Sequence, residues 1–215
     1  MKKQKEIVTD LEQLENLIDY NKKIKESDET FQKIMSIYAM ALKEMSTKVE
    51  IYKDEFKMFY NYDLIDHINF RIKSPESIMK KMQDKGVKLT YKEMIENIND
   101  IVICPVQKDI YSIKNLIQNI PGIQTLKEKD YVAHPKKCGY KSYHIILAVP
   151  VVLSKKLIYV KVEVQIRTMA MDVWATIEHK MRYKPEQELT EKQSKEWSNC
   201  AKAINKVDKK LEYLT

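Results

Sequence analysis

The sequence predicts an α/β protein (α+β in some classifications) with a mixed sheet of about five strands flanked by helices. Three observations lead to this fold. Residues 157–167 alternate between apolar and polar side chains as a half-buried strand does. Shorter apolar segments at 65–73, 100–106 and 143–149 have the length of further strands. Amphipathic helical patterns precede, separate and follow these segments, which favours helices packed on one sheet.

The composition indicates a globular chain with basic character. Of its 215 residues, 44% are hydrophobic, which is enough to bury a core. We expect a single domain over 1–215, with N-terminal helices (1–62), a central core (63–184) and a C-terminal helix (185–215). The net charge of +7 suits polyanionic partners such as nucleotides or RNA, although surplus lysine also serves solubility.

Several protein classes are excluded. The N-terminus has no apolar signal region and no run of about 18 apolar residues occurs, so we expect a cytoplasmic protein without membrane contact. Three irregularly spaced cysteines indicate neither a disulfide framework nor a zinc site. Three glycines in the whole chain cannot build a P-loop or a Rossmann fingerprint.

Two amphipathic helices are expected before the first strand. The first covers 6–26, and Ser27-Asp28 caps a longer one that contains Phe31 and Met45. Four aromatic residues follow, and we expect them to pack in the core, with stacking on RNA bases as the alternative: Phe56, Phe59, Tyr60 and Tyr62.

A cationic cluster surrounds the end of strand 65–73. Arg71 and Lys73 lie on its polar face, and Ser74-Pro75 begins a helix on which Ser77 and Lys81 share one side. The N–H groups at the start of that helix would help these residues to hold an oligophosphate. Scattered surface cations beside a helix cap are an equally good interpretation.

Two further segments carry polar groups to the sheet. Asp100 leads the buried strand 100–106, a position that suits a Mg²⁺ ligand, although a turn aspartate is the commoner explanation. After a helix at 109–120, the loop 134–144 gathers lysine, tyrosine, serine and histidine around Gly139. This composition fits stacking on a base while phosphates are gripped.

Strand 157–167 has an apolar face and a chemically unusual polar face. Glu163, Gln165 and Arg167 follow one another on the polar side and offer a proton acceptor or metal ligand, an amide and a phosphate clamp. Taken alone, a solvated strand face is the commoner explanation. Thr168 then begins a helix, and the last helix covers 190–214 around Trp197, Ala201, Ile204, Val207 and Leu211.

In combination, these motifs resemble the synthetase domain of RelA/SpoT homologues. The pattern consists of Arg71-x-Lys73-x-x-x-Ser77-x-x-x-Lys81, Lys129-Asp-Tyr131 and Pro135-Lys136 with Gly139-Tyr140-x-Ser142-x-His144, and Glu163-Val-Gln-Ile-Arg-Thr168 followed by Met171-Asp-x-Trp-Ala175 and Glu178-His179. The order and spacing are highly specific and extend from about residue 30 to the C-terminal helices. Without other domains, the chain resembles the single-domain small alarmone synthetases of the RelQ type.

The resemblance implies a nucleotidyltransferase-like synthetase fold with N- and C-terminal helices. It also implies GTP/GDP pyrophosphokinase activity in the stringent response. Such an enzyme transfers pyrophosphate from ATP to the 3′-hydroxyl of GTP or GDP, or GMP, and yields (p)ppGpp-type alarmones and AMP. As partners, the same resemblance implies further copies in a homotetramer, and single-stranded RNA or alarmone as regulator. No hydrolase domain is expected, because Asp66-His67 is a single reversed pair.

The resemblance also assigns roles to individual residues. Arg71 would stack on adenine, while the ATP phosphates would be held by Lys73, Ser77 and Lys81. Asp100 would bind Mg²⁺, and Glu163 would help to bind it or act as the base on the 3′-hydroxyl. Tyr140 would stack on guanine, and the acceptor nucleotide would be surrounded by Lys136, His144, Gln165 and Arg167.

Two departures from the family pattern bear on these roles. The family usually has a stretch like Asp-Ile-Ala-Gly-x-Arg, whereas Asp100-Ile101 runs directly into Val102. An even-numbered loss keeps the strand alternation but removes a cation from the ATP site, and Glu96 becomes the alternative metal ligand. Cys138 stands where the family commonly has asparagine. A catalytically weak RNA- or nucleotide-binding regulator of the same fold is therefore the alternative function.

Overall fold

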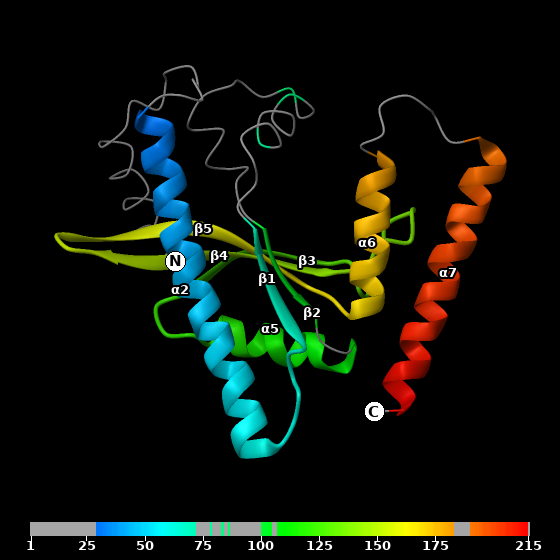
Figure 1. Cartoon of the computed structure of the whole chain (residues 1–215), viewed down its shortest axis with the longest axis horizontal. Helices are drawn as coiled ribbons and strands as arrows, with labels where there is room; N and C mark the ends of the chain where they lie inside the picture. The colour runs from blue at the N-terminus through cyan, green and yellow to red at the C-terminus, as the bar shows by residue number, and fades with distance from the viewer. Residues whose placement is uncertain are drawn as a thin grey trace.

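The computed structural model describes residues 29–71, 78, 83, 86, 100–104, 107–182 and 190–214. Within them, five strands form one sheet in the order β1-β2-β5-β4-β3, with helices packed around it (Figure 1). The expected α/β fold with a mixed sheet of about five strands is confirmed. The helix expected at 6–26 lies outside the described residues, as do Lys73, Ser77, Lys81 and Glu96.

The sheet combines parallel and antiparallel pairs. On one side, β1 (His67–Arg71) runs antiparallel to β2 (Asp100–Cys104), and β2 runs parallel to β5 (Lys156–Ile166). On the other side, β4 (Tyr143–Leu153) is antiparallel to both β5 and β3 (Gln124–Asp130). Strand β5 therefore lies at the centre, between β2, which carries Asp100, and β4, which carries His144.

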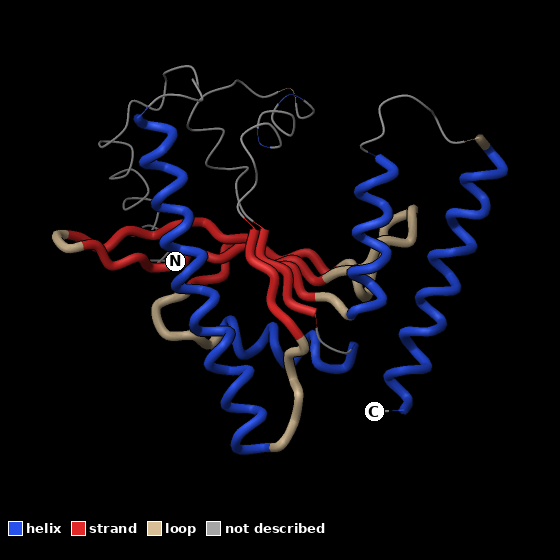
Figure 2. The backbone as a smooth tube through the Cα atoms, viewed as in Figure 1, coloured by secondary structure: helices blue, strands red, loops and turns tan. Residues whose placement is uncertain are grey.

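Strand β4 is longer than its sequence indicated. We expected it to end at Val149, before Pro150, but it continues to Leu153, and Pro150 is paired with Tyr159 of β5. Along β4, the pairing with β3 runs from Tyr143 and ends at Ala148. Among the described residues, the outer side of β4 is therefore unpaired at Pro150. An edge position tolerates the missing N–H of proline. Figure 2 shows the resulting β4–β5 hairpin projecting beyond the other strands.

One face of the sheet is covered by α2 (Glu29–Tyr60) and α5 (Ile110–Gln118), which follows the short 3₁₀ turn η1 (Gln107–Asp109) (Figure 1). Buried residues of both helices share one apolar core with β4 and β5. The alternation predicted for β5 is confirmed by the burial of Ile158, Val160, Val162, Val164 and Ile166. The opposite face of β5 carries its polar residues.

The aromatic residues near the end of α2 divide into two groups. Phe56 and Tyr62 pack against the core, as expected. For Phe59 and Tyr60 the expectation of core packing was wrong, because these side chains are 73% and 65% exposed. Helix α2 continues to Tyr60, and its last turn presents these two rings to solvent.

Two helices pack together at one end of the sheet, α6 (Met169–Arg182) and α7 (Glu191–Leu214) (Figure 1). The indole rings of Trp174 and Trp197 join them, with centroids 4.3 Å apart. Thr190 caps α7 through its hydroxyl, which accepts from the backbone N–H of Gln193.

The C-terminal half of α7 differs from its sequence-based expectation. Val207 and Leu211 were expected on the packed face of the helix, but both side chains are about half exposed. The residues of α7 that are buried are Ala201 and Asp208. The packed face therefore holds a carboxylate where the sequence pattern led us to expect an aliphatic stripe.

Candidate active site

The candidate site lies on the polar face of β4 and β5. In the strand register His144 is paired with Gln165, and Glu163 is paired with Ile146 two positions further along. His144 and Glu163 are thus diagonal neighbours on one face, close enough for their side chains to meet. The alternation in the sequence predicted that Glu163 and Gln165 share this face, but it could not predict which β4 residue lies opposite.

A hydrogen-bonded chain of three side chains runs across this face. Nδ1 of His144 lies 2.7 Å from Oε1 of Glu163, and Nε2 lies 2.8 Å from the hydroxyl of Tyr140. An ionised carboxylate can only accept, so Nδ1 carries the proton in this arrangement. In the tautomer with the proton on Nδ1 alone, Nε2 accepts a hydrogen bond from the Tyr140 hydroxyl, and the imidazole fixes the orientation of Glu163.

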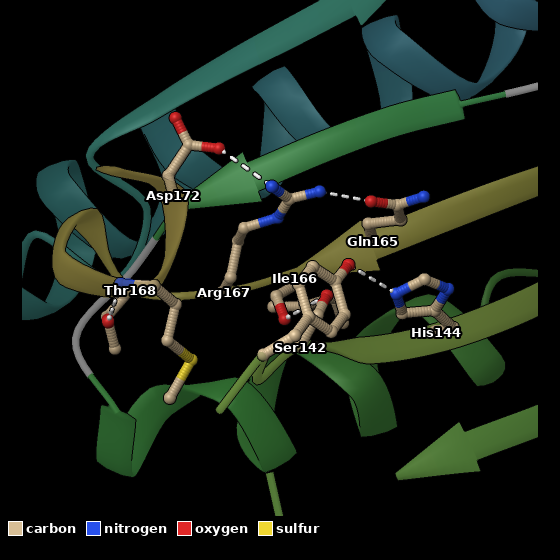
Figure 3. A network of polar contacts seen from close by, with 9 residues as sticks. Ser142, His144, Gln165, Ile166, Arg167, Thr168 and Asp172 are labelled. Carbon is tan, nitrogen blue, oxygen red and sulfur yellow. Dashed lines mark hydrogen bonds and ion pairs between the residues drawn. The ribbon is translucent and has the colours of Figure 1, made fainter. Parts of the chain in front are cut away.

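The guanidinium of Arg167 is held between two partners, as Figure 3 shows. Nη1 donates to Oδ1 of Asp172 over 3.0 Å, and Nη2 donates to Oε1 of Gln165. The carbon of the guanidinium also lies 5.9 Å from the centroid of the Tyr140 ring. Arg167 is thus positioned as a fixed cation beside that ring, which suits the binding of a phosphate group.

Asp172 was not singled out by the sequence reasoning, although it partners a predicted site residue. It lies in the first turn of α6, directly after the strand that carries Arg167. The signal in the sequence is an acid five residues after the arginine, across a strand-to-helix boundary. A contact between two residues at this spacing can be predicted only when the direction of the following helix is known.

Tyr140 lies in a small second core with Trp174, Ala175 and Ala201, and its residue surface is 7% exposed. The ammonium of Lys136 lies 4.5 Å from the centroid of its ring. The same ammonium lies 4.8 Å from the ring of Tyr131, which the sequence reasoning gave no role. Lys136 and Tyr140, both predicted to bind the acceptor nucleotide, are therefore brought together.

The loop that carries these residues is tightly folded against α7. The backbone N–H of Gly139 donates to the carbonyl of Lys136 over 2.8 Å, and Gly139 has a φ of +82° that favours glycine. A Cβ at Gly139 would lie 2.4 Å from the Cβ of Ala201, so any side chain there would collide with α7. The thiol of Cys138 donates to Oε1 of Glu178 on α6 over 3.1 Å.

The backbone register places a second carboxylate-bearing residue beside Glu163. Ile101 of β2 is paired with Val164 of β5, so the preceding residues, Asp100 and Glu163, occupy adjacent positions on neighbouring strands. On its other side, Asp100 is paired with Arg71 of β1. Asp100 therefore reaches this position without the four residues that the family usually has after it.

The donor set at this position is compatible with Mg²⁺. Mg²⁺ is commonly bound by one or two carboxylates together with substrate phosphates, which matches two adjacent acidic residues. Over the described part of the chain, no group of three or more histidine, cysteine, aspartate or glutamate side chains is placed to hold a metal ion. No helix among the described residues is long and apolar enough to cross a membrane.

The site as a whole combines the groups that phosphoryl-type transfer requires. A carboxylate is held in place by a histidine, a fixed guanidinium and a lysine flank an aromatic ring, and a second acidic residue lies next in the register. Phosphoryl-type transfer depends mainly on positioning and on charge stabilisation, so such a set is sufficient in kind.

Comparison with known proteins agrees with the fold. Residues 70–188 match the family described as a region found in RelA / SpoT proteins. This match spans more than half of the chain, which therefore belongs to that family, and the predicted resemblance is confirmed.

Individual relatives cover most of the chain. It is 37% identical over 187 residues to GTP pyrophosphokinase YwaC of Bacillus subtilis. The aligned residues cover 85% of this chain and 89% of the relative. The crystal structure of small alarmone synthetase 2 from Bacillus subtilis is similar with a TM-score of 0.75 and 32% identity, over 86% of this chain and 98% of that one. The crystal structure of small alarmone synthetase 1 of the same organism, bound to its product pppGpp, is similar with a TM-score of 0.78 and 26% identity, over 87% of this chain and 97% of that one.

Proposed function

We propose that this protein is an alarmone synthetase, a GTP pyrophosphokinase that transfers pyrophosphate from ATP to the ribose 3′-hydroxyl of a guanine nucleotide. AMP and a (p)ppGpp-type product result. The observation that carries the proposal is the Tyr140–His144–Glu163 chain, because it connects a fixed carboxylate to an aromatic ring in one site. Relatives that are similar over most of the chain are named GTP pyrophosphokinase or alarmone synthetase.

Glu163 is the proposed base on the 3′-hydroxyl. Its carboxylate accepts from His144, which keeps one oxygen in a defined position on the face of the sheet. An ionised carboxylate within reach of the acceptor hydroxyl takes up the proton as the bond to phosphorus forms. Asp100 and Glu163 would hold Mg²⁺, which supplies positive charge to the phosphates of ATP.

The acceptor nucleotide is proposed to bind over Tyr140. Guanine stacks on this ring while Lys136, Arg167, Gln165 and His144 surround the sugar and phosphates. The Lys136 ammonium now lies over the face of the ring, so a stacked base must displace it. The nucleotide phosphates are the natural new partner for that ammonium, because a charge-assisted hydrogen bond exceeds a cation–π contact in strength.

ATP is proposed to bind at the edge where Arg71 and Asp100 are paired. Arg71 stacks on adenine in this proposal, and Lys73, Ser77 and Lys81 hold the phosphates. The register supports it, because Arg71, Asp100 and Glu163 lie on three strands that are adjacent in the sheet. The reacting phosphorus would then lie between the ATP edge and the guanine ring.

The proposed chemistry is tested by which nucleotide is released. The protein is incubated with ATP, Mg²⁺ and GTP, GDP or GMP, and the products are separated by ion-exchange chromatography. AMP that forms only when a guanine nucleotide is present, together with a new 3′-pyrophosphorylated product, supports the proposal. Nucleotide or RNA binding without turnover would support the regulator of the same fold.

Assembly, location and regulation complete the proposal. A homotetramer is supported by the exposed apolar stripe of Val207, Leu211 and Leu214 on α7, which lacks the burial expected of an amphipathic helix. The proposal includes a single catalytic domain over 1–215. It also includes a cytoplasmic location, because the nucleotide substrates of the proposed reaction occur there. Single-stranded RNA or alarmone remains the proposed regulator. Light scattering during chromatography checks the tetramer.

A further inference from the structure

A buried group of polar side chains includes one residue of α7 and one residue from each of the segments that follow Tyr140 and Arg167. Asp208 of α7 is 5% exposed, and two residues of neighbouring segments that interact with it, Thr168 and Lys141, are 2% and 9% exposed. None of these three residues takes part in the proposed chemistry. Burying a carboxylate and an ammonium costs free energy, so their presence in the interior calls for an explanation.

The hydroxyl of Thr168 takes part in two hydrogen bonds. Its Oγ1 accepts from the backbone N–H of Met171 over 3.1 Å, which caps α6, and its hydroxyl donates to the Asp208 carboxylate. Thr168 directly follows Arg167 in the chain. The side chain of Asp208 therefore fixes the start of α6 at the residue next to the Arg167 clamp.

Lys141 is the second partner and directly follows Tyr140. Burial lowers the pKa of its ammonium, as does Lys209, while the charges of Asp208 and Glu212 act in the opposite direction. Burial raises the pKa of the Asp208 carboxyl, and Glu212 adds to this, whereas Thr168 and Lys141 oppose it. Each buried charge thus has the other as a stabilising neighbour.

The same face of α7 holds the loop at a second point. Ala201, seven residues before Asp208 and on the same side of the helix, lies against Gly139 so closely that no Cβ fits there. Trp197, one turn earlier, packs on Trp174 of α6. Helix α7 therefore contacts both chain segments that carry the ring and the guanidinium of the acceptor site.

We propose that Asp208 is a positioning residue for the acceptor nucleotide, because it holds the residue after Arg167 on the same helix whose Ala201 packs against Gly139 of the loop that carries Tyr140. The inference rests on the proposed function and adds a specific role for α7. Asp208 does not touch the substrate. It sets the distance between the ring on which guanine stacks and the cation beside it.

The test compares Asp208→Asn with Glu196→Gln. Asparagine keeps the shape and an acceptor for Thr168 but removes the buried charge, whereas Glu196 is an exposed carboxylate on the same helix. We expect the KM for the guanine nucleotide to rise about tenfold in Asp208→Asn, since small displacements of a binding group are costly. The KM for ATP and kcat should stay within about twofold, and Glu196→Gln should match the wild type.

Two additional measurements make the outcome decisive. The affinity for GDP is titrated without ATP, and the melting temperature is recorded for each variant. If Asp208→Asn does not fold, Lys141→Met is added to remove the unpaired ammonium, and the same rise in guanine nucleotide KM is expected. Equal rises in both KM values would indicate a general structural role and overturn the inference.

The inference and the proposed function fail in different ways. An active wild type whose folded Asp208 variants keep an unchanged KM and affinity for the guanine nucleotide would overturn the positioning role alone. Wild-type protein that neither forms the 3′-pyrophosphorylated product nor binds GDP would overturn the proposed function, and the positioning role with it. An ATP affinity that changes as much as the GDP affinity would likewise contradict a role confined to the acceptor.

Discussion

Nδ1 of His144 lies 2.7 Å from Oε1 of Glu163, across two neighbouring strands. The other nitrogen of the same ring contacts the hydroxyl of Tyr140 at 2.8 Å. One imidazole therefore links the carboxylate proposed to remove a proton with the ring proposed to hold the acceptor base. Because the register of β4 and β5 sets this contact, the position of the base and the position of the acceptor depend on the same pair of strands.

The first prediction concerns Glu163. Glu163→Gln keeps the shape of the side chain but removes the proton acceptor and its charge, so turnover should fall about a hundredfold or more. GDP and ATP binding should persist, because Arg71, Tyr140 and the lysines remain. The matched control is Glu50→Gln on the exposed side of α2. Initial rates within a few-fold of the wild type for Glu163→Gln would remove this residue from the mechanism.

The second prediction separates the two nucleotide sites. Tyr140→Ala should weaken guanine nucleotide binding by about 1–3 kcal/mol, the usual value of a base–aromatic stack, and leave ATP affinity nearly unchanged. Arg71→Ala should have the reverse effect. Tyr140→Phe keeps the ring and loses only the contact with His144, so its affinity for GDP should stay close to that of the wild type. Calorimetric titrations in which both ligands weaken equally in both alanine variants would show that the pockets are misassigned.

The third prediction concerns the packing of the loop on α7. Gly139→Ala introduces a Cβ that collides with Ala201 at a φ of +82°, so we expect lower stability and a higher KM for the guanine nucleotide. Gly122→Ala is the control, because its φ is +83° but its nearest neighbour is the flexible edge of the Pro150 ring at 3.3 Å. That variant should lose stability without any change in KM. A wild-type KM for the guanine nucleotide in Gly139→Ala would contradict a role of the loop in acceptor binding.

The fourth prediction concerns alkaline pH. The Tyr62 hydroxyl donates to both carboxylate oxygens of Asp109, at 2.9 and 2.7 Å. Burial and then Asp109 raise the pKa of Tyr62 from 10.0 to about 12. A raised folded-state pKa means that this contribution to stability is complete below pH 10.0 and is lost as the pH rises through about 12.

The test of this relationship is Tyr62→Phe. At pH 7 the variant should be less stable by about 1–2 kcal/mol, because a partly buried carboxylate loses its donor. Urea unfolding between pH 9 and about 12 should show a smaller alkaline loss for the variant than for the wild type. Other tyrosines with raised pKa values, such as Tyr111, keep that loss above zero. Parallel curves for the two proteins would contradict the assignment.

Much of the fold could be predicted because apolar and polar side chains alternate along its central strand. β5 has five buried aliphatic residues on one face, and the sequence located it with an error of one residue at each end. β3 was not identified, because Gln124–Asp130 contains four charged residues and lies at the edge of the sheet. A polar edge strand has little apolar pattern, so only its pairing with β4 defines it.

The site was harder to predict than the fold because its contacts depend on register. The sequence placed Glu163 and Gln165 on one face, but the diagonal contact with His144 depends on how β4 pairs with β5. Asp172 and Tyr131 stood in the family pattern but received no role, because each follows the end of a strand, where periodicity carries no information. Asp208 was missed for another reason, since a buried carboxylate contradicts the amphipathic pattern on which the prediction of α7 rested.

The central claim is that pyrophosphate moves as a unit from ATP to the ribose of a guanine nucleotide. ATP labelled at the β-phosphorus, supplied with GDP, Mg²⁺ and the full-length protein, tests this most directly. The account predicts that the label leaves ATP and appears on the 3′-oxygen of the guanine nucleotide as a pyrophosphate, while the AMP released is unlabelled. Label retained in ADP, with a single phosphate transferred or set free, would contradict it.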